Sequence, residues 1–315
     1  MNKIEFGDCR EIMKRWKEKG VKVQTVVTSP PYFGLRDYGH DGQIGLEQTV
    51  GEYVYNIVDV FRDVWNILED DGTVWLNLGD SYYNYRPGKG QALNKQTVSN
   101  SNQDLPITCA RRGNKQEGLK EKDLIGIPWR VAFALQDFGW YLRQDIIWHK
   151  PNPMPESVRD RCTKAHEYIF LLTKKPQYYF NNEAIKESAI HSNRTAGNKN
   201  PQKGTGQDKM EIRGGLLAAQ QKIYEMKNKR SVWTVNVKPY KGAHFATFPK
   251  ELIEPCILAG SKEGDIVFDP FMGSGTTAQV ALQHNRQYMG CELNPEYKQL
   301  QDERILNAKQ MEQSQ

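Results

Sequence analysis

Residues 269–277, with the sequence DPFMGSGTT, decide the fold of this chain. They predict a strand that ends in the glycine turn Gly273-Ser274-Gly275 and continues as a helix, an arrangement that lets the backbone approach a nucleotide-like ligand closely. Such a turn normally opens an α/β domain, because the sheet is wound outward from this first unit. Here only one more strand and one more helix can follow it. The sequence therefore predicts a permuted domain, with its chemistry in the N-terminal half.

The rest of the chain alternates between expected strands and helices. Strands are expected at residues 21–28, 73–78, 143–148, 167–173, 177–180, 265–268 and 287–291, and helices at 50–68, 128–138, 249–257, 276–283 and from 294 onward. Lys174-Lys175-Pro176 separates two of these strands and predicts an antiparallel hairpin at the sheet edge. Asp70-Asp71-Gly72 is expected to end the helix before it. The alternation predicts a mainly parallel sheet with helices on both faces.

The composition is that of a water-soluble protein with one large α/β domain and a small accessory piece. The chain has 315 residues, 26% of them charged, and a mean hydropathy of -0.72. Residues 1–9 lack the apolar core of a signal peptide, and no run of about 18 apolar residues occurs. We therefore expect a cytoplasmic protein with no membrane partner. Its scattered cysteines indicate neither a disulfide framework nor a metal site: Cys9, Cys109, Cys162, Cys256 and Cys291.

The net charge of +5 is concentrated in two blocks. Residues 84–123 hold 8 Lys/Arg against 4 Asp/Glu, and residues 186–230 hold 10 against 4. Basic, polar blocks with few large apolar residues cannot build a core. They are either solvated surface or contacts to a polyanion, and only a neighbouring site can decide between these two interpretations.

Glu292 stands 19 positions after Gly273, at the end of the next expected strand, where a carboxylate can accept both hydroxyls of a ribose. The same spacing suits an NAD-dependent dehydrogenase, and a tight turn with a capping glutamate would explain it without any ligand. A phosphate-binding P-loop is disfavoured because no lysine follows the glycines. The acidic group and aromatic face of Asp269-Pro270-Phe271 favour a cationic, zwitterionic ligand with an adenine ring, such as S-adenosylmethionine.

The second strong pattern is Ser29-Pro30-Pro31-Tyr32, directly after the expected strand at 21–28. Two prolines fix the backbone, so the Ser29 hydroxyl and the Pro30 carbonyl can form a rigid pair of acceptors beside the Tyr32 ring. A planar base that carries an amino group needs such a pair. A stiff loop with a tyrosine in the core is the alternative.

Together these patterns resemble the amino-group DNA methyltransferases of the permuted β arrangement, in which the catalytic motif precedes the cofactor motif. The resemblance covers almost the whole chain. It implies a circularly permuted, Rossmann-like α/β fold for S-adenosylmethionine, with a mostly parallel sheet, an antiparallel hairpin edge and a small target-recognition insertion. The implied parts are a catalytic half at 1–180 with a basic loop at 84–123, the insertion at 181–235 and a cofactor-binding half at 236–315.

The resemblance also implies site residues. The catalytic ones would be Ser29, Pro30, Pro31 and Tyr32, and no metal is implied. The cofactor would be bound by Asp8, Cys9, Thr28, His244, Phe245, Phe248, Asp269, Pro270, Phe271, Gly273, Ser274, Gly275, Thr276, Glu292 and Leu293. Among these, Asp8 would accept from the adenine amino group, and residues 244–249 would close over the methionine moiety. Residues 161–168 are similar to bacterial and phage members; for Asp8 and His166, a helix cap and a packed histidine remain the alternatives.

The implied activity is transfer of a methyl group from S-adenosylmethionine to an exocyclic amine of a base flipped out of double-stranded DNA. Ser29 Oγ and the Pro30 carbonyl would accept from the amine while Tyr32 stacks on the base. Serine is a weak base, so the proton would be lost to water after transfer. The basic blocks would bind phosphates, and the segment from 181 to 230 would read the target.

Alternatives remain open for the target base and for the functional class of the protein. Serine at the first motif position favours cytosine N4, with adenine N6 as the alternative, since both amines need the same acceptors. Cytosine-C5 chemistry is disfavoured because Pro255-Cys256 lies in an apolar helix pattern. A dehydrogenase would leave the Ser29 motif unexplained, and a non-catalytic DNA-binding module would leave the cofactor pattern unexplained. A homodimer and a cognate restriction endonuclease are compatible with the resemblance as further partners.

Overall fold

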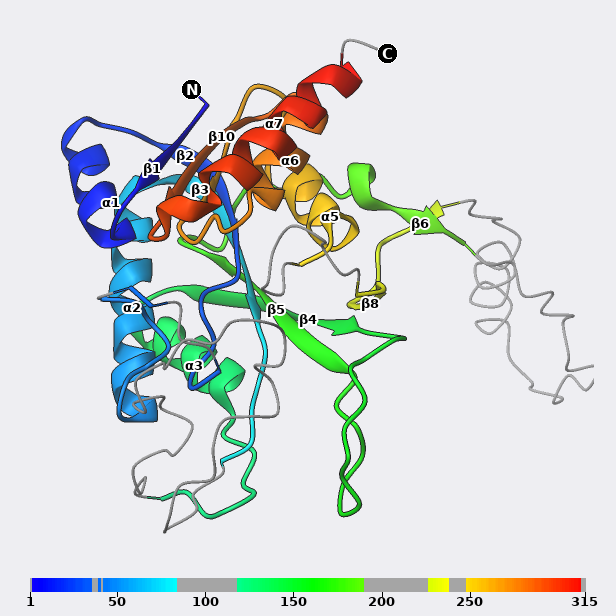
Figure 1. Cartoon of the computed structure of the whole chain (residues 1–315). Helices are drawn as coiled ribbons and strands as arrows, with labels where there is room; N and C mark the ends of the chain where they lie inside the picture. The colour runs from blue at the N-terminus through cyan, green and yellow to red at the C-terminus, as the bar shows by residue number, and fades with distance from the viewer. Residues whose placement is uncertain are drawn as a thin grey trace, which may run out of the picture. The chain divides into compact units, whose positions relative to one another are not determined.

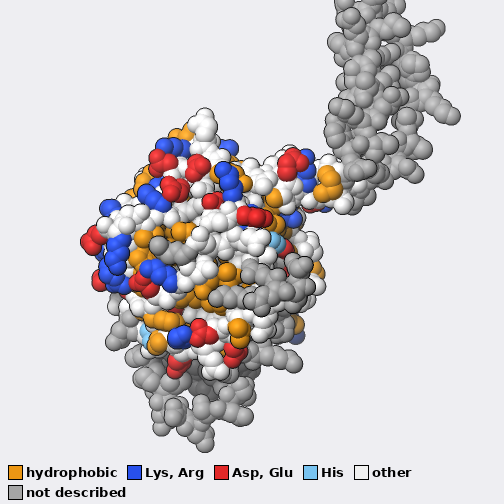
Figure 2. Space-filling model, turned by 90° about the horizontal axis from the view of Figure 1, so that it is seen from above, with side chains coloured by type: hydrophobic (Ala, Val, Ile, Leu, Met, Phe, Trp, Pro, Cys, Tyr) orange, Lys and Arg blue, Asp and Glu red, His pale blue; other side chains and the backbone are white. Residues whose placement is uncertain are grey.

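The computed structural model describes residues 2–35, 39–40, 42–83, 118–189, 226–237 and 248–312. They belong to two compact units, Met1–Phe180 with Ser231–Gln315, and Asn181–Arg230. Most of both basic blocks, residues 84–117 and 190–225, lies outside the described residues. On the face shown in Figure 2, the Lys and Arg side chains of the described residues are interspersed with Asp and Glu. No helix in the described ranges is long and apolar enough to cross a membrane.

An eight-stranded sheet forms the centre of the larger unit (Figure 1). Its strands are β1 (Lys3–Phe6), β2 (Val23–Thr28), β3 (Leu68–Leu78), β4 (Tyr141–His149), β5 (His166–Thr173), β8 (Val232–Thr234), β9 (Ile266–Asp269) and β10 (Gln287–Glu292). Their order across the sheet is β1-β10-β9-β2-β3-β5-β4-β8. Only β5 runs antiparallel to its neighbours among these described strands. The late strand β9 therefore lies beside the early strand β2, as the predicted permutation requires.

Helices cover both faces of this sheet (Figure 1). They are α1 (Cys9–Glu18), α2 (Val50–Ile67), α3 (Ile127–Phe138), α5 (Lys250–Gly260), α6 (Thr276–Gln283) and α7 (Lys298–Glu312). Val26 of β2 belongs to the core with α1, α2 and α3, whereas a Cβ added to Gly260 of α5 would meet Thr25 Oγ1 at 2.6 Å. Because successive strand residues point to opposite faces, α5 covers the other side of the sheet.

Helix α2 shows why the sequence folds locally as expected. Thr49 accepts a hydrogen bond from the Glu52 backbone while the Glu52 side chain accepts from Thr49, which forms a capping box. Tyr53, Ile57 and Val64, at helical spacing, are fully buried against the core. The apolar periodicity and the cap therefore act together to place this helix.

The antiparallel hairpin is formed by different strands from those predicted. Strand β5 pairs with β4, as at Ile146 and Ile169, and with β3 on its other side. Residues 177–180 form no strand, and the Tyr179 backbone N–H donates to the Asp71 carbonyl at 2.8 Å. The prediction was wrong because both edges of β5 are already paired, with β3 and with β4, so no edge is left for a hairpin partner at residues 177–180.

Helix α2 ends at Ile67, close to the predicted end, but the chain passes directly into β3 at Leu68, so residues 70–72 lie within the strand that was predicted to begin at residue 73. Asp70 instead forms an ion pair with Lys175 at 2.7 Å within the start of the strand. Three elements of the larger unit were not predicted: β1, α1 and β8. The two strands are only four and three residues long, whereas α1 has clear helical spacing at its buried residues Cys9, Ile12, Met13 and Trp16 and was missed. The smaller unit contributes β6 (Glu187–Ser188) and β7 (Met226–Lys227), which pair antiparallel, and a 3-10 turn η1 (Glu183–Ile185).

Candidate active site

Loops that follow three neighbouring parallel strands line one cavity of about 250 Å³. Residues 29–32 follow β2, residues 270–274 follow β9, and residues 292–294 lie at the end of β10. In open α/β sheets, ligands bind at the carboxyl ends of the strands, where the strand order reverses. The two strong sequence patterns are therefore brought together at the usual ligand-binding edge.

Most of the predicted site residues line this cavity. They are Asp8, Cys9, Ser29, Pro30, Pro31, Tyr32, Phe248, Pro270, Phe271, Gly273, Ser274, Thr276, Glu292 and Leu293. Thr28, Asp269 and Gly275 do not line it, and His244 and Phe245 lie outside the described residues. Within the described ranges, no group of His, Cys, Asp or Glu is arranged to hold a metal ion.

The glycine turn requires glycine for two physical reasons. Gly275 has a φ of 86° at the N-terminus of α6, a conformation that side chains rarely adopt. A Cβ added there would also lie 3.3 Å from the Gln301 Cα of α7. The Gln301 amide in turn donates to the Gly273 carbonyl at 2.7 Å. Helix α7 therefore holds the turn from behind and leaves the other side to the cavity.

Glu292 is the acidic group at the cavity wall, and it is only 9% exposed. Its two carboxylate oxygens accept from the backbone N–H groups of Gly273, at 2.7 Å, and Asn294, at 2.9 Å. Burial raises the pKa of Glu292, although these backbone hydrogen bonds favour the ionised form. Each oxygen has a further lone pair, so the carboxylate can still accept from hydroxyl groups of a ligand.

Ser274 independently indicates that the cavity binds a polar ligand. Its side chain is buried, it lines the cavity, and its Oγ has no hydrogen-bond partner among the described residues. Buried hydroxyls are normally hydrogen-bonded. A polar ligand that also reaches Glu292 would satisfy both groups, so the residues present fit a ribose-bearing, zwitterionic cofactor.

Asp269 is only 1% exposed and does not line the cavity. Its hydrogen bonds instead hold the neighbouring segments together. One carboxylate oxygen accepts from the Thr28 hydroxyl at 2.6 Å and from the Phe271 backbone N–H at 3.0 Å. The other accepts from the Thr277 hydroxyl at 2.7 Å. Burial raises the pKa of Asp269 to about 6, against the effect of these hydrogen bonds. Asp269 thereby ties the loop after β9 to the end of β2.

Replacing Asp269 by asparagine should stabilise the protein in a pH-dependent way. Below about pH 6 the wild-type group is neutral in the fold, whereas above it a charge is buried, so the wild-type free energy of unfolding falls as pH rises. Asparagine keeps an acceptor for Thr28, and Thr277 can then donate to the Val27 carbonyl, 3.4 Å away. The unfolded group ionises near pH 3.8 and the folded one near pH 6, so the change falls between these values, and we expect the variant to gain on the order of 2 kcal/mol relative to wild type between about pH 4 and about pH 7.

Chemical denaturation of both proteins at the two pH values measures this difference. The stability of the variant relative to wild type should be greater at the higher pH by this amount. The same stability difference at both pH values would show that Asp269 does not change its charge in this range.

Asp8 acts as a helix cap and also lines the cavity. Its carboxylate accepts from the Arg10 backbone N–H at 2.8 Å and from the Arg10 guanidinium at 2.5 Å, at the start of α1. Burial opposes ionisation, but the hydrogen bonds from Arg10 lower the pKa of Asp8 overall. Burial raises the pKa of the adjacent Cys9 thiol to about 12, so this group faces the cavity in its neutral form.

The loop at residues 29–32 is fixed from the side of α2. The Tyr53 hydroxyl donates to the Pro31 carbonyl at 2.9 Å, and Pro30 is buried. A Cβ added to Gly79 would lie 2.6 Å from the Tyr32 ring, so the ring packs directly on the backbone after β3. Ser29 comes directly before these anchored residues and lines the cavity.

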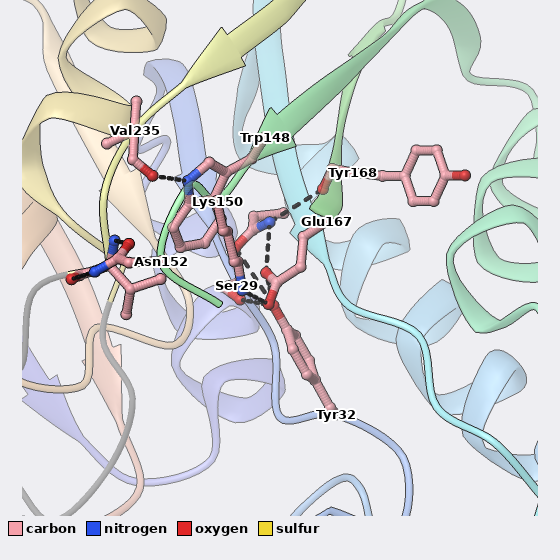
Figure 3. A network of polar contacts seen from close by, with 10 residues as sticks. Ser29, Tyr32, Trp148, Lys150, Asn152, Glu167, Tyr168 and Val235 are labelled. Atoms are coloured by element: carbon pink, nitrogen blue, oxygen red, sulfur yellow. Dashed lines mark hydrogen bonds and ion pairs between the residues drawn. The ribbon is translucent and has the colours of Figure 1, made fainter. Parts of the chain in front are cut away.

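A polar network continues from Ser29 to the antiparallel part of the sheet (Figure 3). The Ser29 hydroxyl donates to Tyr32 Oη at 3.3 Å, and the Tyr32 hydroxyl donates to Glu167 Oε2 at 2.7 Å. The other oxygen of Glu167 forms a short ion pair with Lys150, whose ammonium lies 4.2 Å from the ring centroid of Trp148. Burial raises the pKa of Tyr32 well above its usual value, so its hydroxyl stays protonated.

The cavity lining also includes residues that the sequence did not predict, among them Asn77, Trp148, Lys150 and Glu167. These four come from the ends of β3 and β4 and from the start of β5. An antiparallel strand places its N-terminal end beside the carboxyl ends of its neighbours, and this is what brings Glu167 to the site. The only sequence signal was that residues 161–168 looked similar to known relatives, without a role for any one side chain. The adjacent His166 packs edge-on against Tyr168 and does not line the cavity.

Comparisons with known proteins agree with this geometry. Residues 23–303 match the family model N6_N4_Mtase, described as DNA methylase. The type II methyltransferase M.Cfr9I of Citrobacter freundii is 47% identical over 92% of this chain and 83% of its own length. The type II methyltransferase M.SmaI of Serratia marcescens is 46% identical over 98% and 91% of the two chains.

Solved structures share the fold at lower identity. The PvuII DNA methyltransferase, described as cytosine-N4-specific, has a TM-score of 0.62 at 18% identity, over 96% of this chain and 86% of its own. The complex of M1.HpyAVI with SAM has a TM-score of 0.56 at 18% identity, over 97% and 99% of the two chains. The fold is thus the Rossmann-like fold of S-adenosylmethionine-dependent DNA methyltransferases. From the match to the family model and the full-length relatives, the chain belongs to the DNA methylase family of amino-group methyltransferases.

Proposed function

We propose that this chain transfers a methyl group from S-adenosylmethionine to the exocyclic N4 amine of cytosine in double-stranded DNA, after the base has been flipped out of the duplex. The observation that carries the proposal is that Ser29 and Glu292 line the same cavity, from the ends of β2 and β10. The acceptor site and the cofactor site are therefore adjacent. Extruding the base costs a few kcal/mol of unstacking, which contacts in the pocket must offset.

The cofactor end of the cavity suits the parts of S-adenosylmethionine. Glu292 would accept from the ribose hydroxyls, Ser274 would hydrogen-bond a polar group, and Asp8 would accept from the adenine amine. The rings of Phe248 and Phe271 add an apolar wall. When bound, the cofactor supplies an activated methyl group on a sulfonium centre.

The acceptor end would activate a poor nucleophile. The lone pair of an exocyclic amine is delocalised into the ring, so hydrogen bonds from both N–H groups must draw the nitrogen toward tetrahedral geometry. We assign the acceptor roles to Ser29 Oγ and the Pro30 carbonyl, and the Tyr32 ring would stack on the base. Catalysis of this kind is positioning and electrostatic stabilisation, which requires a preorganised loop. The anchoring of Pro31 by Tyr53 supports that requirement.

Cytosine N4 is preferred to adenine N6 on the strength of the serine at position 29. A cytosine-N4-specific enzyme among the structures that share the fold adds to this preference. Adenine N6 is the alternative, because its amine needs the same two acceptors. A dehydrogenase is not supported, since the chain belongs to the DNA methylases. A non-catalytic DNA-binding module would not need the cavity wall formed by Ser29 and Glu292.

The base can be identified directly. Purified protein is incubated with isotope-labelled S-adenosylmethionine and unmethylated genomic DNA, and the DNA is digested to nucleosides and analysed by mass spectrometry. The proposal expects label in N4-methylcytosine. Label in N6-methyladenine would change the base and keep the reaction, whereas no label in any base, with cofactor binding intact, would support the non-catalytic alternative.

Double-stranded DNA is the proposed partner, with the basic blocks at 84–123 and 186–230 as phosphate contacts and the segment from 181 to 230 as the target-recognition part. Binding through phosphates weakens steeply with salt. A homodimer and a cognate restriction endonuclease are further proposals, and the second draws on the names of the type II relatives.

A further inference from the structure

A continuous line of hydrogen bonds leads from the proposed acceptor group, Ser29, to a carboxylate, Glu167 (Figure 3). We propose that Ser29, Tyr32 and Glu167 form a proton relay that removes the proton released from the methylated amine, with Glu167 as its final acceptor. This inference rests on the proposed function. It assigns a positioning and relay role to Glu167 and a proton-transfer role to the Tyr32 hydroxyl, and it replaces direct loss of the proton from the amine to water.

The direction of the relay follows from the inventory of donors and acceptors. The Tyr32 hydroxyl has two acceptors within reach, Glu167 Oε2 at 2.7 Å and Asn77 Oδ1 at 3.4 Å, and its single proton points toward the nearer, charged carboxylate. Tyr32 Oη is then free to accept from the Ser29 hydroxyl at 3.3 Å. With its own proton committed to Tyr32, Ser29 Oγ presents lone pairs to the cavity. Glu167 therefore makes Ser29 an acceptor for the target amine, through Tyr32.

Several elements hold Glu167 in place. Lys150, from the end of β4, pairs with one oxygen, and the Asn77 amide, from β3, donates to the other at 3.2 Å and to the Tyr168 carbonyl at 3.1 Å. The side chains of Lys150 and Glu167 are only 18% and 15% exposed. The Lys150 ammonium lies over the Trp148 ring, and the Trp148 indole N–H donates to the Val235 carbonyl at 2.8 Å, which fixes that ring. A carboxylate fixed in this way needs no reorganisation during the reaction, which makes a relay through it effective.

The proton balance of the relay is complete within these groups. After methyl transfer the amine nitrogen carries a positive charge and two protons. One N–H bond breaks and its electron pair stays on nitrogen, while the proton joins Ser29 Oγ; the Ser29 proton moves to Tyr32 Oη, and the Tyr32 proton moves to Glu167. The positive charge on the amine and the negative charge on Glu167 cancel. The neutral carboxylic acid returns its proton to water once the product has left.

The charges around Glu167 set the conditions for a test. Lys150 forms the ion pair, while Lys164 and His166 lie close enough for Glu167 to act on them electrostatically. Burial lowers the pKa of both Lys164 and His166. Both of these groups persist when Glu167 is changed, so an effect that is lost in Glu167→Gln does not come from Lys164 or His166.

The test measures steady-state turnover in methyl transfer, with saturating cofactor and duplex DNA, in the full chain, because the relay acts after the methyl group has moved and so limits the completion of each cycle. Tyr32→Phe keeps the ring and removes the relay, and Glu167→Gln keeps the shape and removes the final acceptor. Each should slow transfer by about 100-fold, the lower range of a lost proton-transfer group, with cofactor affinity changed less than about twofold. Tyr55→Phe on the exposed side of α2 and Glu18→Gln at the end of α1 are matched controls that should keep the wild-type rate.

Two readouts exclude a merely structural effect. Residues that act as one unit are non-additive, so Tyr32→Phe should add little to the defect of Ser29→Ala in the double variant. The dependence of the wild-type rate on pH should change in Glu167→Gln, which a merely structural role of Glu167 would not produce. Thermal unfolding of each variant confirms that it is folded.

The outcomes are distinct for the relay and for the function on which it rests. A wild-type rate in Tyr32→Phe, in a preparation whose wild type methylates DNA, overturns the relay and leaves the function standing. Fully additive defects of Ser29→Ala and Tyr32→Phe also overturn it. If the wild-type protein transfers no methyl group to DNA although it binds the cofactor, the proposed function fails first.

Discussion

Replacing Ser29 by alanine should lower the rate of methyl transfer by about two to three orders of magnitude, the usual effect of losing one preorganised hydrogen-bonding group in a transition state. The hydroxyl is the side-chain acceptor that the proposed mechanism gives to the target amine, and the cavity wall formed by Glu292 and the glycine turn is not touched by the change. Single-turnover assays with labelled cofactor measure the rate, and calorimetry measures cofactor binding.

Ser29→Asn is the matched variant for this experiment. Its amide can donate to Tyr32 and accept from the base at once, so it should recover part of the rate that alanine loses. An equal loss of cofactor affinity and transfer rate in Ser29→Ala would contradict the role of Ser29 as an acceptor for the substrate amine.

Replacing Glu292 by alanine should weaken S-adenosylmethionine binding by about 10- to 100-fold, which corresponds to losing charge-assisted hydrogen bonds of about 1.5–3 kcal/mol. The change removes the acceptor proposed for the ribose, and it also leaves the backbone N–H groups of Gly273 and Asn294 without their acceptor. The glycine turn should therefore lose its shape as well as its ligand contact. Equilibrium calorimetry in the absence of DNA measures the affinity.

Glu292→Gln separates these two effects. It retains one oxygen for a backbone N–H but turns an NH2 group toward the other, so its affinity should fall between those of wild type and alanine. Glu303→Ala, on the exposed side of α7, is the control for a changed charge nearby. Unchanged affinity in Glu292→Ala would remove this residue from the cofactor site.

The parts of the fold that could be predicted from sequence carry strong local signals. The glycine turn before α6 and the two prolines after β2 constrain the backbone within a few residues, and each lies where the pattern predicted it. Their meeting in one cavity could be inferred because parallel strands share one carboxyl edge. Helix α2 was predicted from its apolar spacing for the same local reason.

The parts that could not be predicted depend on pairings between distant segments. Glu167 reaches the site only because β5 runs antiparallel between β3 and β4, whereas the local turn after it suggested a different hairpin. Asp269 shows a second limit. Its position just before the glycine turn is evident in the sequence, but the burial of its side chain could not be predicted. Whether a carboxylate faces a ligand or braces a loop depends on the strand next to it, here β2.

The hydrogen bond between Thr28 and Asp269 joins residues 241 positions apart, at the centre of the sheet where β2 lies beside β9. A growing polypeptide therefore carries β2 as an open sheet edge from early in translation until residues 266–269 have left the ribosome. Long-range pairings of this kind form late in folding. We expect ribosome-bound chains that stop before β9 to be protease-sensitive and unable to bind the cofactor. The protein would then become active only after its last strands have been synthesised.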